Sequence, residues 1–203
     1  DGHGTAQRLV TSPLHQDPGS WSRDGRWLAY AEMDPKTGFD LWAFDQTTGR
    51  SQPFRRTATN ELFPVLSPDG RWIAYTSDES GRREVFVEAF PGGGSRVQLS
   101  SNGGTEANWS SAGNEIFFRA GGRLMSVRVT VGATLNTTVP VPLFSAPFDD
   151  GATFGPRGYA VAPDDEHFYF QRSPTPVPTP HRIRVVVNWL EEFQRRLKSQ
   201  AAP

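Results

Sequence analysis

The chain has 203 residues, a formal net charge of −1 and no cysteine. This length allows one or two domains with a buried core. The lack of cysteine excludes disulfides, thiolate metal sites and cysteine nucleophiles. The balanced charge creates no field that attracts nucleic acid, and no apolar run approaches the roughly 18 residues of a membrane span. We therefore expect no nucleic-acid partner and no membrane insertion.

A short motif recurs four times along the chain. Residues 20–31 read SWSRDGRWLAYA and residues 65–76 read VLSPDGRWIAYT, and weaker copies occupy 108–118 and 161–170. The equivalent turn positions are Ser22, Ser67, Ser110 and Ala162, at intervals of 45, 43 and 52 residues. A repeat of about 40–50 residues without helical periodicity is typical of β-propeller blades.

Each copy predicts a β-hairpin. In the second copy, Pro68 presets the backbone, Asp69 can accept N–H groups, and Gly70 can adopt a positive φ. The apolar run that follows, 72–75, suits a strand that is covered on both faces. Further strands are predicted at 40–44, 84–90 and 124–129, with outer strands at 95–99 and 7–10. The sequence therefore predicts an all-β fold of about four four-stranded blades.

The C-terminal part of the chain departs from the repeat. Residues 173–180 alternate proline with threonine and valine, which suits either a domain linker or a stiff loop of the fourth blade. We favour the loop, because the repeat places it between two strands of that blade. A third strand is then predicted at 183–187, and Asn188 can cap a short helix at 189–198. The expected organisation is blades over 1–190 and a C-terminal helix and tail over 188–203.

The motif SPDGRWIAY at 67–75 resembles the WD-like repeat of TolB-type β-propellers. The segment VVVNWLEEF at 185–193 resembles the end of propellers fused to bacterial serine/threonine kinases, although the chain carries none of the kinase motifs. The resemblance implies a fold rather than a function, because the same repeat serves scaffolds, peptidase gates and hydrolases. It also makes a periplasmic or extracytoplasmic location plausible, although the chain shows no targeting signal.

The repeat number predicts a partner. Propellers of this family usually have about six to eight blades, so four blades resemble the C-terminal part of a longer ring. An open arc would expose two apolar faces. Closure as a four-bladed ring would remove them, and so would a homodimer that forms an eight-bladed ring. We favour the homodimer, because blades shaped for a wider ring splay at wider angles.

Candidate site residues follow from the register of the repeat. Propeller ligands bind at the mouth of the central channel, on loops that lead into the innermost strands. These loops carry residues 15–17, 60–61, 105–108 and 154–157. We predict that Glu61, Glu106, Asn108 and Arg157 contact a ligand there.

The same loops could hold a metal ion. Converging carboxylates of Asp17, Glu61 and Glu106 could bind Ca²⁺ or another divalent cation in the channel, or they could be solvated acids that cap turns. His15 could act as a general base with Asp17 as its partner.

Two functions remain open at this point. The first is a ligand- or protein-binding module that acts through the channel mouth. The alternative is a metal-assisted hydrolase of the lactonase, esterase or phosphotriesterase type, with its site at the propeller centre. The chain lacks a Gly-x-Ser-x-Gly nucleophile motif, and the repeated Ser22, Ser67 and Ser110 have the positions of turn formers. These observations favour the binding module.

Overall fold

The computed structural model describes residues 5–132, 134–145 and 157–171. Within these ranges, all regular secondary structure consists of β-strands. No helix in the described part of the chain is long and apolar enough to cross a membrane. The predicted proline-rich loop at 173–180, the strand at 183–187 and the helix at 189–198 lie outside the described residues.

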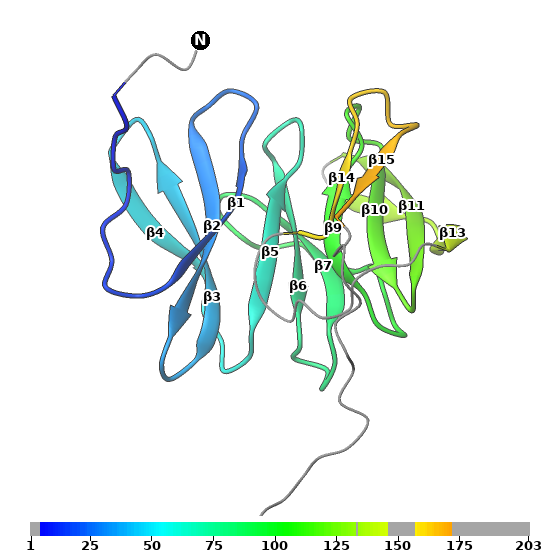
Figure 1. Ribbon diagram of the computed structural model, residues 1–203, viewed down its shortest axis with the longest axis horizontal. Coiled ribbons are helices and arrows are strands. Elements are labelled where there is room, and N and C mark those ends of the chain that lie inside the picture. Colours follow the sequence, from blue (N-terminus) through cyan, green and yellow to red (C-terminus); the bar gives the residue numbers. More distant parts are fainter. Residues whose placement is uncertain (1–4, 133, 146–156, 172–203) are drawn as a thin grey trace, which may run out of the picture. The chain divides into compact units, whose positions relative to one another are not determined.

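The strands form four successive antiparallel sheets in chain order (Figure 1). Blade 1 contains β1 (Gln16–Trp21), β2 (Trp27–Asp34), β3 (Gly38–Asp45) and β4 (Arg50–Arg55). Blade 2 contains β5 (Glu61–Leu66), β6 (Trp72–Ser77), β7 (Glu84–Ala89) and β8 (Arg96–Gln98). Blade 3 contains β9 (Thr105–Trp109), β10 (Glu115–Ala120), β11 (Arg123–Val131), β12 (Leu135–Thr137) and β13 (Val141–Ser145). Blade 4 is described as one hairpin, β14 (Tyr159–Val161) and β15 (Phe168–Phe170).

Within the described residues, the predicted blade strands are confirmed, with one exception. Residues 7–10, which we expected to form an outer strand of an earlier blade, form no strand. An outer strand needs a neighbouring strand for its backbone hydrogen bonds, and no described strand pairs with this segment. In blade 3 the outer position is shared, because β12 pairs with one half of β11 and β13 pairs with the other.

The repeated serine closes the turn between the first two strands of each full blade. In blade 2, Ser67 Oγ donates to Asp69 Oδ1 at 2.6 Å and accepts the backbone N–H of Trp72 at 3.0 Å. In blade 1, Ser22 makes the equivalent bonds to Asp24 and Trp27 at 2.5 and 2.8 Å. The repeated serines are therefore turn formers, as their spacing predicts.

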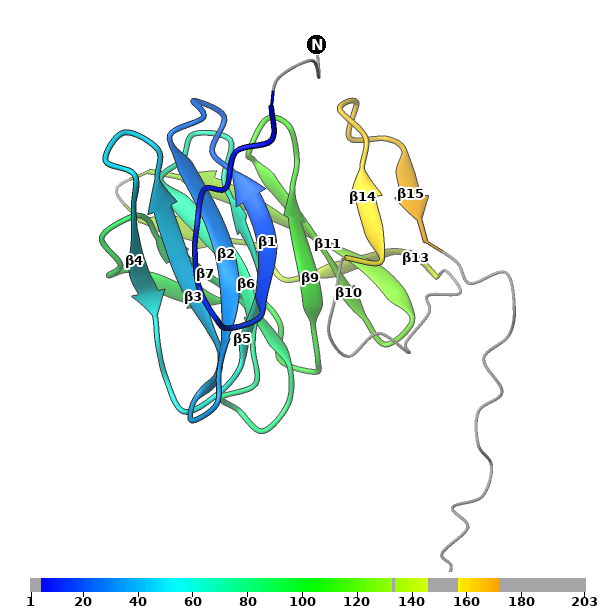
Figure 2. The ribbon, with the colours of Figure 1, turned by 60° about the vertical axis from the view of Figure 1, so that its left-hand side comes forward.

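Apolar side chains fill the space between neighbouring blades. The blades stand side by side in Figure 1, and in Figure 2 blade 1 lies in front of blade 2. Strand β6 shows the principle, because Ile73 and Tyr75 pack towards blade 1 while Trp72 and Ala74 pack towards blade 3. A third, smaller cluster joins blade 3 to the β14–β15 hairpin through Tyr159 and its neighbours. The continuous apolar run at 72–75 thus reflects burial on both faces of the sheet.

Candidate functional site

The first strands of the blades lie next to one another. The backbone N–H of Leu66 on β5 donates to Ser20 Oγ on β1 at 2.8 Å, and Trp109 Nε1 on β9 donates to the Val65 carbonyl at 3.3 Å. A Cβ on Gly19 would lie 2.3 Å from the carbonyl oxygen of Pro64. Glycine at position 19 is therefore required for the close approach of β1 and β5.

Each of these three first strands carries an irregularity at a corresponding place. The pairing register shifts between Pro18 and Ser20 in β1 and between Leu62 and Val65 in β5. In the ladder between β9 and β10, the shift lies between Phe117 and Arg119 of β10. Phe63 and Glu106 have φ values of 55° and 56°, which are unusual for residues other than glycine. Bulges of this kind re-aim side chains and release carbonyl groups from the ladder.

The side chain of Arg157 binds the carbonyls at these bulges. Its guanidinium donates to Phe63 O and Pro64 O, each at 2.8 Å, and to Gly19 O at 3.3 Å. One side chain before β14 thereby joins the first strands of blades 1 and 2. Burial lowers the pKa of Arg157, with partial compensation from Tyr159 and Glu106, and its Nε is buried without a hydrogen-bond partner.

Arg157 also lines a small cavity. It measures about 30 Å³ and is lined by Asp17, Pro18, Ala31, Leu62, Phe63, Pro64 and Arg157. A volume of this size accepts one water molecule or one small polar group. Asp17 Oδ1 lies 3.1 Å from His15 Nε2, and the two side chains are 26% and 66% exposed. The structure thus brings Asp17 and Arg157 to one cavity and places His15 against Asp17.

Glu106 holds the segment that carries Arg157. Its Oε1 accepts from Arg119 Nη1 at 2.8 Å, and its Oε2 accepts the backbone N–H of Gly158 at 2.7 Å. Glu106 is 3% exposed, so both bonds are shielded from water. Asn108, two residues further along β9, lies beside the Tyr159 hydroxyl, which donates to the Phe117 carbonyl at 3.0 Å. Glu106 and Asn108 therefore support the strand that follows Arg157.

Glu61 occupies a different environment. It is fully buried, and its Oε1 accepts from the hydroxyls of Thr57 and Thr59 at 2.6 and 3.0 Å. Its Oε2 is buried without a hydrogen-bond partner, and burial raises the pKa of this carboxyl. The charged neighbours that influence it are Arg55 and Asp40.

We expected Asp17, Glu61, Glu106 and Asn108 on loops, but they lie within β1, β5 and β9. The loop assignment was wrong because each first strand begins before its bulge. The three carboxylates have separate partners. Among the described residues, no group of three or more histidine, aspartate or glutamate side chains could hold a metal ion.

Two parts of this site have no recognisable signal in the sequence. The carbonyls of Gly19, Phe63 and Pro64 are backbone groups, so no residue type marks them. The partner of Glu106, Arg119, lies 13 residues away on the paired strand β10 and belongs to no motif.

No family model matches the chain. It is 27% identical over 116 residues to the uncharacterized protein Atu1656 of Agrobacterium fabrum, which covers 57% of this chain and 39% of that protein. It is 28% identical over 114 residues to the uncharacterized peptidase YuxL of Bacillus subtilis, with 55% of this chain and 17% of YuxL covered. The chain therefore spans well under half the length of these curated relatives.

Solved structures show the fold. TolB from Acinetobacter baumannii superposes with a TM-score of 0.58 at 18% identity, covering 82% of this chain and 40% of TolB. A protein assigned as TolB in Agrobacterium tumefaciens gives a TM-score of 0.53 at 20% identity, covering 65% of this chain and 52% of that one. The predicted TolB-like β-propeller fold is confirmed. The resemblance to kinase-fused propellers stays a prediction, since its residues lie outside the described ranges.

Proposed function

We propose that the chain is a binding module that takes its ligand where the first strands of the blades meet, at the cavity between Asp17 and Arg157. The observation that carries this proposal is the position of Arg157. Arg157 lines the cavity, its guanidinium is held on three carbonyls, and its Nε is buried without a hydrogen-bond partner. A charged side chain that is already held in place loses little conformational entropy when a ligand binds to it.

The size and chemistry of the cavity limit what enters it. A space of about 30 Å³ accepts a single hydroxyl, amino or carbonyl group, so most of the ligand must lie outside. Arg157 offers a donor and Asp17 offers an acceptor. We therefore expect a polar small molecule or a peptide segment that presents one donor and one acceptor close together.

Binding is better supported than metal-assisted hydrolysis at a three-carboxylate centre. The hydrolase needs Asp17, Glu61 and Glu106 at one ion. Instead, Glu61 accepts from two threonine hydroxyls and Glu106 accepts from Arg119. The His15–Asp17 pair has the distance of a base and its orienting acid, and in our proposal it contributes to polar recognition.

The test is a thermal-shift screen of amino acids, dipeptides and monosaccharides. The matched variants are Asp17→Asn and Glu166→Gln, the second being an exposed acid in the β14–β15 turn. We expect at least one compound to raise the melting temperature of the wild type and of Glu166→Gln but not of Asp17→Asn. The proposal fails if no compound shifts the wild type, or if every shift survives in Asp17→Asn.

We also propose that a second copy of the chain completes the ring. Large apolar side chains are exposed on the first and the last blade. Trp21 and Met33 of blade 1 are 45% and 43% exposed, and Tyr169 of blade 4 is 66% exposed. Light scattering is expected to give about twice the chain mass of 22.5 kDa. A monomer mass across the micromolar range would contradict the dimer.

A further inference from the structure

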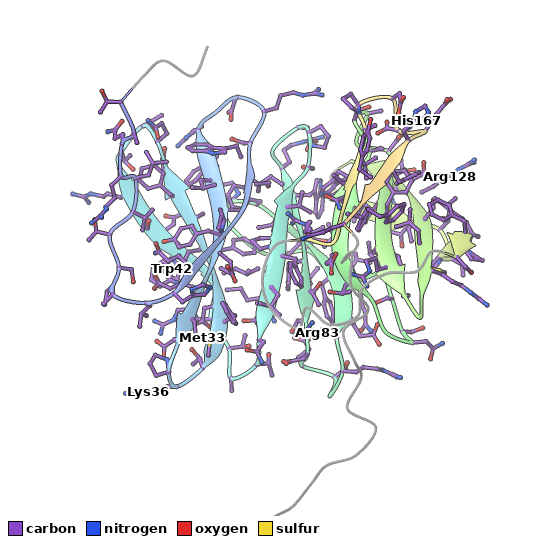
Figure 3. All side chains as sticks on the ribbon, in the orientation of Figure 1. Met33, Lys36, Trp42, Arg83, Arg128 and His167 are labelled. Atoms are coloured by element: carbon purple, nitrogen blue, oxygen red, sulfur yellow. The ribbon has the colours of Figure 1, made fainter. Side chains whose placement is uncertain are left out.

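A second cavity lies between blades 2 and 3. It measures about 240 Å³ and is formed by the β6–β7 loop, the β8–β9 loop and the β10–β11 turn. Its lining residues are Arg82, Arg83, Gly103, Gly104, Thr105, Arg119, Ala120, Gly121 and Gly122. We call it the arginine cavity. Figure 3 labels Arg83 at the end of blade 2 that corresponds to Met33 and Lys36 in blade 1.

Three arginines from two different blades line this cavity, and two of them are held from behind by buried acids. Arg82 Nε lies 3.0 Å from Glu84 Oε1, and Arg119 Nη1 lies 2.8 Å from Glu106 Oε1. The side chains of Glu84 and Glu106 are only 1% and 4% exposed. The acids therefore orient the two arginines. The side chain of Arg82 is 60% exposed, whereas that of Arg119, which also lines the cavity, is 10% exposed.

The third arginine is Arg83. Burial is the main influence on it and lowers its pKa, while Asp78 and Glu106 act in the opposite direction. A nearby negative charge favours the charged form of arginine, so an anion in the cavity would act in the same direction as these two acids.

The rest of the lining is mostly glycine backbone. Gly103, Gly121 and Gly122 have φ values of 91°, 56° and 73°, a conformation that favours glycine. A Cβ on Gly104 would lie 2.5 Å from Ser100 Oγ. Without side chains here, a ligand can approach the main chain closely.

An adjoining cavity of about 240 Å³ shares Gly103 and Ala120 with the first. Phe118, Met125, Val139 and Pro140 contribute apolar surface to it, and Ser100 and Ser101 contribute hydroxyl groups. The two spaces together suit a ligand with a charged end and a less polar body.

We propose that the arginine cavity binds the carboxylate or phosphate group of a small ligand whose less polar part occupies the adjoining cavity. Arginine suits both groups, because its planar fork of donors matches their oxygens. This site is separate from the Asp17–Arg157 cavity, and its ligand need not be the same.

Isothermal titration calorimetry at low salt tests the proposal with three probes, namely inorganic phosphate, N-acetylglutamate and the uncharged N-acetylglutaminamide. We expect saturable binding of phosphate, N-acetylglutamate or both, and at least tenfold weaker binding of N-acetylglutaminamide. Binding of phosphate alone would identify a phosphate-bearing ligand, and binding of N-acetylglutamate alone a carboxylate. Failure of both anions, or equal binding of the glutamine probe, would overturn the proposal.

Arg82→Met and Arg71→Met provide a matched pair of variants. The two arginine side chains are 60% and 61% exposed, and each contacts an acid at 3.0 or 2.8 Å. Arg71, however, lies in the Ser67 turn and does not line the arginine cavity. We expect Arg82→Met to weaken anion binding about tenfold and Arg71→Met to leave it unchanged. Equal effects of the two substitutions would mean that only general surface charge is involved, which would refute the site.

Discussion

The buried ion pair between Glu106 and Arg119 gives the sharpest test of how the centre is held. In Glu106→Gln the shape of the side chain is kept, but its charge is lost. A glutamine can accept from either Arg119 or the N–H of Gly158, and its amide group then faces the donor that is left. We expect a large loss of stability, because the buried guanidinium of Arg119 would lose the negative charge of Glu106.

The size of the expected stability loss follows from the burial of both partners. The side chains of Glu106 and Arg119 are 4% and 10% exposed and lie 2.8 Å apart. Removing one partner of a buried pair costs about 3–5 kcal/mol. We take the lower end, about 3 kcal/mol, since Arg119 also borders the open arginine cavity. With a urea m-value of about 2 kcal/mol/M, the unfolding midpoint should fall by about 1.5 M.

Urea unfolding followed by tryptophan fluorescence measures this change in a double-mutant cycle with Arg119→Met. The double variant leaves no buried charge at this place, so we expect it to be more stable than Glu106→Gln alone. A loss below about 1 kcal/mol in the single variant, or additive effects in the double variant, would refute the reasoning.

Three further predictions concern the same centre. Arg157→Met should lower the free energy of unfolding by about 2–4 kcal/mol, because three hydrogen bonds to carbonyl groups are lost. Arg157→Lys should not restore it, because lysine lacks the planar fork of donors. A loss of less than about 0.5 kcal/mol would contradict this. Gly19→Ala should lower the free energy of unfolding by about 2–3 kcal/mol, because its Cβ would collide with the Pro64 carbonyl. Gly49 has open space around its Cβ position but a φ of 67°, so Gly49→Ala should lower it by only about 1 kcal/mol. Equal losses in thermal unfolding would contradict the close approach of β1 and β5. Burial raises the pKa of Glu61 above its ordinary 4.5, so the folded state binds the proton of this carboxyl more tightly than the unfolded state does. The stability of the wild type relative to Glu61→Gln should therefore fall as the pH rises above about 4.5. A constant difference in stability from about pH 4 to 8 would contradict this prediction.

The blades were predictable from the sequence because the information that specifies them is local. Ser67, Asp69 and Gly70 form a turn through contacts within a few residues, and the apolar run at 72–75 records burial on both faces. The interval between copies then gives the repeat architecture. The outer strand expected at 7–10 failed, because a strand depends on a neighbour that local sequence does not reveal.

The candidate site was predictable only in part. Asp17 and Arg157 were expected near the channel, and they do share a cavity. The convergence of Asp17, Glu61 and Glu106 was inferred from equivalent positions in the repeat, but those positions differ by one or two residues relative to the turn serines. In a strand with a bulge, such an offset changes the direction of the side chain. Glu61 therefore reaches two threonines and Glu106 reaches an arginine of its own blade.

Glu106 connects the two cavities. One of its oxygens holds the N–H next to Arg157, and the other holds Arg119, which lines the arginine cavity. Glu106 has its positive φ at the bulge of β9, where the ladder with β10 shifts register. Such a bulge changes the direction of the side chain it carries. In our two proposals, this one residue of β9 therefore supports an arginine at each site.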